Sequence, residues 1–215
     1  ILNRMTSNVD YGTNGDTALT RPESAPLPNT SDDYIVTKND FDVATGRRTK
    51  SFDNKNIETR TYFDDINRTV KVIENFTGDG SITETTAGDV NRTEETIFDS
   101  KGRLAYFKAR NPKGSGNGIE DQNTYYVYGD SVNASLQTAV IYPDSTDTIS
   151  LDGNNIVSIS AGTDHVSTTY DHLGRRTTQT DQRGTQHTYV FDSAGRLEKD
   201  RVTALGGVDD YVKSV

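Results

Sequence analysis

The chain has 215 residues, of which 31% are hydrophobic, and its mean hydropathy is −0.74, so we expect a thin core of the kind found in a sheet with one solvated face rather than in a compact enzyme. Its net charge of −9 and the lack of any basic stretch argue against a nucleic-acid partner. The absence of cysteine excludes disulfides and thiolate metal sites, and no apolar run approaches the roughly 20 residues of a membrane helix, so no membrane insertion is expected.

The N-terminal segment, residues 1–33, is predicted to be a loop or linker because its "RPESAPLP" stretch is spaced by prolines. The sequence opens at Ile1 without an initiator Met or a leader, which predicts a piece of something longer. Residues 34–215 are predicted to form a β-sheet region. Irregular insertions are expected near 78–89, 111–123 and 144–155.

A short pattern recurs along the chain: an aromatic residue, Asp, two variable positions, Gly and Arg. It is intact in three places, has Asn in place of Gly in one, carries an extra residue in another and lacks the Arg in a weaker copy. The steps between turn-forming Asp residues are 10 or 11 positions, which is one strand plus one turn. The predicted turn residues are Asp42, Gly46, Arg47, Asp64, Asn67, Arg68, Asp99, Gly102, Arg103, Asp171, Gly174, Arg175, Asp181, Gly184, Asp192, Gly195 and Arg196.

The pattern predicts a hairpin turn whose chemistry can be read position by position. The Asp side chain can accept a hydrogen bond from the backbone N–H two residues later. Gly supplies a left-handed residue beside a β-bulge, and Asn tolerates that conformation best among other residues. We therefore expect positive φ at Gly102, Gly174, Gly184, Gly195 and Asn67. The following Arg can reach the Asp carboxylate, in a surface pair worth about 0–1 kcal/mol.

The segments between the turns are 6–8 residues long, rich in Thr, Val, Tyr and Phe, and show no apolar stripe of helical period. This pattern predicts an all-β fold, an antiparallel meander of hairpins.

The stretch "TTYDHLGRRTTQTDQRGTQHTYVFDSAGRL" resembles the YD repeats of the Rhs/YD-repeat family, and the Tyr128-Gly129 unit with "AVIYPDS" resembles the YD-repeat surface proteins of planctomycete-type bacteria. The resemblance runs from about residue 34 to 212. It implies a sheet that spirals into a shell, barrel or fibre, as in Rhs and Tc-type toxins, where the shell encloses toxin polypeptides, and in the teneurin barrel. The self-cleaving C-terminal region of Rhs shells has no counterpart in this sequence.

No combination of residues indicates catalysis. Neighbouring carboxylates such as Asp64 and Asp65 would point to opposite faces of a strand. His165 and His187 could meet across strands, but turn and strand roles account for them without a metal. The turns at Asp79-Gly80 and Asp152-Gly153 leave Ca²⁺ as a weak possibility without the full spacing of a calcium loop. We expect no enzyme activity and no catalytic, cofactor-binding or metal-binding residue.

Five tyrosines are predicted to lie near strand ends, where they could stack in ladders or form an exposed platform for sugars. The structural interpretation is favoured, and the platform stays open as the ligand-binding alternative. These tyrosines are Tyr125, Tyr126, Tyr128, Tyr170 and Tyr189.

The sequence thus favours a non-catalytic scaffold segment of a large extracellular or cell-surface YD-repeat protein, forming a wall, stalk or fibre. The alternatives are an adhesin or glycan-binding module and part of a toxin-encapsulating shell. Self-association is expected through sheet edges near 34–38 and 211–214, or pairing with flanking repeats, because an edge strand carries unpaired N–H and C=O groups.

Overall fold

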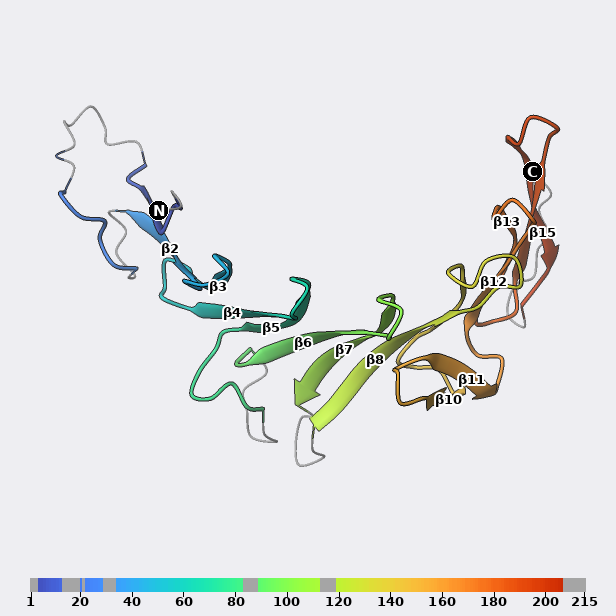
Figure 1. The fold of residues 1–215 in the computed structure, drawn as a ribbon, viewed down its shortest axis with the longest axis horizontal. Coiled ribbons are helices and arrows are strands. Elements are labelled where there is room, and N and C mark those ends of the chain that lie inside the picture. The colour runs from blue at the N-terminus through green and yellow to red at the C-terminus, as the bar shows by residue number, and fades with distance from the viewer. Residues whose placement is uncertain are drawn as a thin grey trace. The chain divides into compact units, whose positions relative to one another are not determined.

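The structure is a computed structural model that describes residues 4–12, 20, 22–28, 34–82, 89–112 and 119–206. These residues form strands and turns, with no helix among them. Thirteen strands follow one another in a single antiparallel sheet, in the order β1 to β9 and then β12 to β15, and β10 pairs with β11 in a separate sheet of two strands. The all-β antiparallel meander predicted from the sequence is confirmed (Figure 1).

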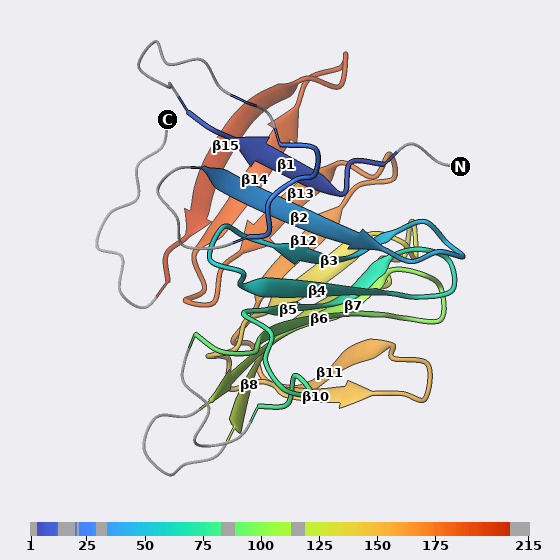
Figure 2. The same ribbon diagram turned by 90° about the vertical axis from the view of Figure 1, so that its left-hand side faces the viewer.

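The chain divides into two compact units, Ile1–Glu95 with Ala109–Asp121, and Thr96–Lys108 with Gln122–Val215. The first six strands of the sheet are neighbours in chain order, as Figure 2 shows for β1 to β4. They are β1 (Ser7–Asp10), β2 (Ile35–Phe41), β3 (Arg48–Phe52), β4 (Glu58–Phe63), β5 (Thr69–Glu74) and β6 (Arg92–Phe98).

The remaining strands continue the meander and add one excursion from it. They are β7 (Leu104–Pro112), β8 (Ile119–Tyr128), β9 (Gln137–Ile141), β10 (Thr148–Leu151), β11 (Val157–Ala161), β12 (Val166–Tyr170), β13 (Arg176–Thr180), β14 (Gln186–Phe191) and β15 (Leu197–Ala204).

The first unit has a small core at the connection that follows β5. Ile73, Phe76 and Ile82 are buried there, and the guanidinium of Arg60 lies over the Phe76 ring. A Cβ on Gly80 would come within 2.5 Å of that ring, so the chain can pass Phe76 only with glycine at this position.

The second unit has a core of its own because the β10–β11 hairpin covers one face of the sheet. Ala105, Ile141 and Val157 are its buried members, at 1%, 0% and 4% exposure. Since Val157 belongs to the hairpin and the other two belong to the sheet, the hairpin forms a second layer over this part of the sheet.

Three expectations about the irregular segments need correction. Residues 7–10, inside the segment predicted as a linker, form β1 and pair with β2, so the N-terminal edge is not at 34–38. Their alternating Ser-Asn-Val-Asp pattern suits a strand with one half-buried face. The edge predicted at 211–214 lies outside the described residues.

The insertions expected at 111–123 and 144–155 contain regular structure. Residues 119–123 are the start of β8, and Arg110 of β7 and Asp121 of β8 form an ion pair at 3.2 Å. The second insertion holds β10 and the turn into β11, at the predicted Asp152-Gly153 position. In both places polar strand residues had suggested loops.

Candidate functional site

The repeated turn is the most regular feature of the molecule, and its Asp side chain holds it together. In the turn that begins at Asp64, the Oδ1 atom accepts the backbone N–H groups of Ile66 at 3.1 Å and Arg68 at 2.8 Å. The Asp64 N–H donates to the Arg68 carbonyl at 3.0 Å, and the Asn67 N–H donates to the Asp64 carbonyl at 3.0 Å. The same Oδ1 pattern, two and four residues on, recurs in the turns at Asp53, Asp99, Asp152, Asp171, Asp181 and Asp192.

The predicted left-handed residues are confirmed. Gly102, Gly174, Gly184 and Gly195 have φ of 80°, 76°, 86° and 80°, and Asn67 has φ of 80°. The register of the flanking strands shifts at the aromatic residue before the Asp, as between Tyr62 and Phe63, which is the expected bulge.

Four of the five motif arginines bind the carboxylates of their turns as predicted, Arg47 being the exception, but not all of the pairs lie on the surface. In each intact copy, and in the Asn67 copy, the arginine Nε donates to the Asp Oδ2 at 2.6–2.8 Å. The Asp99–Arg103 pair is the exception in burial, since its side chains are 2% and 14% exposed. The other pairs are Asp64–Arg68, Asp171–Arg175 and Asp192–Arg196.

These contacts lower the pKa of the carboxyls of Asp64, Asp99, Asp171 and Asp192. For Asp171 and Asp192 the largest cause is the hydrogen bond from the backbone N–H of the arginine four residues later. For Asp99, burial works in the opposite direction, but the bonds to Arg103 outweigh it and the pKa is still lowered. All four therefore remain ionised at neutral pH.

The turn at 42–47 departs from the pattern because it carries one extra residue. Asp42 accepts the N–H of Thr45, three residues on rather than two, at 2.7 Å. Gly46 has φ of 74° and holds the left-handed position. The guanidinium of Arg47 lies over the Phe63 ring, 4.6 Å from its centre, and its Nη2 is buried without a hydrogen-bond partner.

The arginines also connect successive repeats. Arg175 lies 4.4 Å from the centre of the Phe191 ring, which precedes the Asp of the next intact turn. Arg103 lies over Tyr128 in the same way, at 4.5 Å. Each such arginine therefore bonds the acid of its own turn and stacks on the aromatic residue of another, which joins neighbouring hairpins at one end of the strands.

The five predicted tyrosines are half-buried rather than fully exposed. Tyr125 packs against Tyr106 with ring centres 5.2 Å apart, and Tyr189 lies under Arg176 at 4.7 Å. The Tyr170 hydroxyl donates to the Gln137 carbonyl at 2.7 Å. Tyr126 and Tyr128 lie on β8, and the Arg103 guanidinium stacks on the Tyr128 ring. In the part of the chain that the structure describes, the rings of these tyrosines therefore contact arginine more often than another tyrosine, whereas the sequence favours ladders of stacked tyrosines.

His165 and His187, which could have met across strands, each contact an acid instead. His165 bonds to Asp147, whose side chain is fully buried, at the base of the β10–β11 hairpin. His187 bonds to Asp200 across β14 and β15 at 2.8 Å. Over the described part of the chain, no group of three or more His, Asp or Glu residues is placed to hold a metal ion.

The carboxylates considered for calcium serve their own turns. Asp79 accepts from the N–H and the hydroxyl of Ser81, and Asp152 accepts from the N–H groups of Asn154 and Ile156. Calcium binding stays a prediction.

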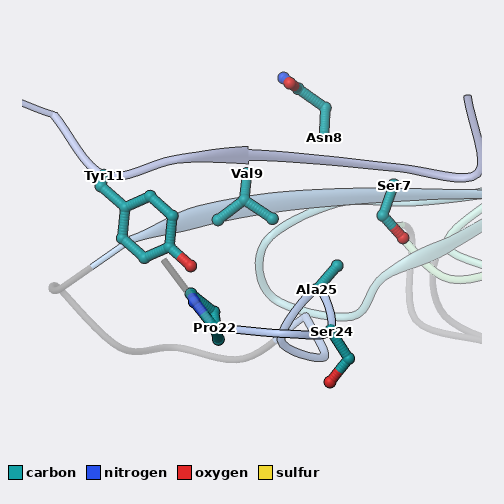
Figure 3. Close-up of a pocket in the computed structure, with 7 residues that line it drawn as sticks. All are labelled: Ser7, Asn8, Val9, Tyr11, Pro22, Ser24 and Ala25. Carbon is teal, nitrogen blue, oxygen red and sulfur yellow. The ribbon is translucent and has the colours of Figure 1, made fainter. Parts of the chain in front are cut away.

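Open pockets lie along the sheet. The one between the turns at Asp42 and Asp64 is lined by acidic, basic and hydroxyl side chains, and the Asp42 and Asp64 carboxylates there accept N–H groups of their own turns. Another, of about 370 Å³, lies between β1 and residues 22–25. Figure 3 shows Val9 and Tyr11 on the side of β1 that faces Pro22, with Asn8 on the other side. None of the described residues that line this pocket is charged. Within the described ranges there is also no helix that could cross a membrane.

Two features were missed from the sequence. The turn at Asp152 makes the same Asp hydrogen bonds as the recurring turn and has Asn155 in the left-handed place, at φ of 57°, although it lacks the aromatic residue and the Arg of the motif; the spacing from Asp to Asn could have identified it as a copy. The exposed ring near Tyr170 belongs to Tyr142, at 43% exposure, which was not among the predicted tyrosines. Only the packing of the folded chain distinguishes Tyr142, with its exposed ring, from the half-buried tyrosines that were predicted.

No family model and no curated protein matches the chain. Solved structures similar to it include the TcdB2-TccC3-Cdc42 complex, with 19% identity over 80% of this chain and a TM-score of 0.39. Another is the Tc holotoxin pore of Photorhabdus luminescens, with 13% identity over 84% of this chain and a TM-score of 0.38. A third is TcdB2-TccC3 without its hypervariable C-terminal region, with 12% identity over 77% and a TM-score of 0.28. The chain spans 9–10% of the length of these proteins.

Proposed function

We propose that this chain is a non-catalytic structural segment of a large extracellular repeat protein, where it continues a β-scaffold that serves as a cell-surface wall, stalk or fibre. The observation that carries the proposal is the use of the motif residues. The recurring acid closes its own turn through two backbone N–H groups, and the recurring base binds that acid and a neighbouring aromatic ring. Side chains whose polar groups are engaged in these structural contacts stabilise the fold and are poorly placed to exchange protons with a substrate.

The edge of the sheet at β15 also favours pairing with another β-strand. Within the described residues β15 has β14 as its only neighbour in the sheet, and seven of its eight residues are exposed. The N–H and C=O groups on the outer side of such a strand can pair with another strand. In this proposal that strand belongs to a flanking repeat of the parent protein or to a second copy of the chain.

Sedimentation velocity over a range of micromolar concentrations, combined with hydrogen exchange, tests the scaffold proposal. We expect association that grows with concentration, together with slower exchange of amides in Leu197–Ala204. The central strand Arg176–Thr180 is the internal control, since its exchange should not depend on concentration. A monomer at all concentrations, with freely exchanging outer amides in β15, would contradict edge pairing. An intact mass near 23.7 kDa for the protein from its source would contradict the large parent.

A further inference from the structure

The two faces of the sheet in the second unit differ in what covers them. The β10–β11 hairpin packs on the face that carries Ala139 and Ile141, which are 4% and 0% exposed. Successive residues of a strand point to opposite faces, so Val140 belongs to the other side. There Val140 is paired with Val166 of β12 in the register of the sheet.

An open pocket of about 460 Å³ lies on this second side, where β9, β12 and β13 meet. Tyr142 lines it and is 43% exposed, so part of its ring is accessible to a ligand. Val140 and Val166 supply apolar surface beside the ring, and Thr168 supplies a hydroxyl.

The charge of this pocket is opposite to that of the chain. Among the described residues that line it, Arg176 is the only charged one, although the chain as a whole carries −9. Burial raises the pKa of the Tyr170 hydroxyl; the charge of Arg176 opposes this rise and the charge of Asp130 adds to it.

Arg176 is also held in place. It lies over the Tyr189 ring, and its Nη1 donates to Gln179 Oε1 at 2.9 Å. The Tyr189 hydroxyl donates to the same oxygen at 3.3 Å. These bonds fix the Gln179 amide through its oxygen, so its N–H groups can donate to a ligand, as can the remaining N–H groups of the arginine.

We propose that this pocket binds an acidic carbohydrate, with a sugar ring stacked on Tyr142 and its carboxylate bound by Arg176. A pyranose presents a face of C–H groups that packs on an aromatic ring, and its hydroxyl groups suit amide and threonine partners. An oriented guanidinium binds a carboxylate through two parallel N–H bonds. The pocket places these three kinds of group together, and an open shape suits one unit of a longer chain.

Calorimetric titration of the 215-residue chain with trigalacturonic acid tests the proposal, with the fully methyl-esterified trisaccharide as its uncharged match and triglutamate as an acidic peptide. We expect binding of the acidic sugar that is at least about tenfold tighter than binding of either match. Tyr142→Ala and Arg176→Gln should each weaken it about tenfold, because each removes one of the two main contacts.

The chain supplies a matched control for each substitution. Tyr62→Ala removes a ring that is 40% exposed in the other unit. Arg48→Gln removes an arginine at the same place in its repeat as Arg176, which also bonds a side-chain amide, Asn39, through Nη1. Both should change the affinity less than about twofold. Thermal unfolding should show that all four variants are folded, since the substituted side chains are partly exposed.

Three results would each overturn the proposal. They are no heat of binding with millimolar trigalacturonate, equal affinity for the ester or the peptide, and equal loss of affinity in the control variants.

Discussion

The turns at Asp99 and Asp192 have the same local geometry in different surroundings. In both, the Asp Oδ1 accepts two backbone N–H groups at 2.9 Å and the arginine Nε donates to Oδ2 at 2.7 or 2.8 Å. The Asp99 side chain is 2% exposed, whereas the Asp192 side chain is 27% exposed and Arg196 is 81% exposed. The motif alone therefore determines the turn, and packing determines how much the turn contributes to stability.

The difference in burial has an identifiable source. The β10–β11 hairpin approaches the turn that begins at Asp99, where the Ser100 N–H donates to the Asn154 carbonyl at 3.0 Å. Asn155 donates from its side chain to the Phe98 carbonyl at 3.3 Å. Arg103 also donates to the Ala134 carbonyl at 2.6 Å. Water is thus displaced from the Asp99 turn by segments that the motif does not encode.

The largest effect is expected from removing the two carboxylates. Asp99→Ala should lower the free energy of unfolding by about 3 kcal/mol, because it leaves buried N–H groups and a nearly buried guanidinium without their acceptor. Asp192→Ala should lower it much less, because water can replace most of what is lost. Urea unfolding of both variants measures the two values. Equal losses would show that burial does not govern the contribution of the turn.

Substitution of the left-handed glycine should destabilise the Asp99 turn and the Asp192 turn by similar amounts, because backbone strain is local and does not depend on burial. Gly195→Val and Gly102→Val should each cost about 1–3 kcal/mol, since both residues have φ of 80° and a β-branched residue resists that conformation. At Gly195 the nearest atom to an added Cβ is Arg175 Nη1 at 3.4 Å, so strain rather than collision dominates.

Gly195→Asn is the matched control for that strain. Its cost should be smaller than that of valine, since Asn67 occupies the same place in its own turn with φ of 80°. Urea unfolding again provides the measurement. An asparagine variant as unstable as the valine variant would contradict the role assigned to the left-handed position.

The turns could be predicted from the sequence because all their determinants lie within five consecutive residues. The same local pattern predicted positive φ at Asn67 despite its side chain, which the structure confirms. The β1 strand and the hairpin layer could not be predicted, because Val9 pairs with Val36 and Val157 packs on Ile141 across long stretches of chain. The arginine–aromatic contacts also join residues in different turns, so no single copy of the motif reveals them.

Lowering the pH should reveal a smaller contribution to stability, which the ionised carboxyls of the exposed turns share. The folded-state pKa values of Asp64, Asp171 and Asp192 lie below the ordinary value of 3.8. A lowered folded pKa means that the stability these groups provide is present above the ordinary value and is lost as pH falls through the folded value. Stability should therefore be nearly level above pH about 5 and decline below pH about 4.

Asp192→Asn tests the acid dependence directly. This variant should be less stable at pH 7 but should lose less stability between pH 5 and pH 3 than the parent chain, because its amide does not titrate. Thermal unfolding across this pH range gives the comparison. An unchanged pH dependence in the variant would contradict the assignment of that loss to the turn carboxyl.

The smallest effect is expected at the exposed arginine. Arg196→Ala should change the free energy of unfolding by less than about 0.5 kcal/mol, because an exposed ion pair adds little beyond the backbone bonds that Asp192 keeps. Arg103→Ala should cost about 2 kcal/mol, since it leaves the buried Asp99 carboxylate unpaired and also removes the stack on Tyr128 and the bond to the Ala134 carbonyl. Arg103→Lys separates these contributions: lysine keeps the charge, but it lacks the planar group that bonds the acid while lying on the ring. A lysine variant as stable as the parent would show that charge alone acts at Arg103, and that the connection between successive turns contributes little to the fold.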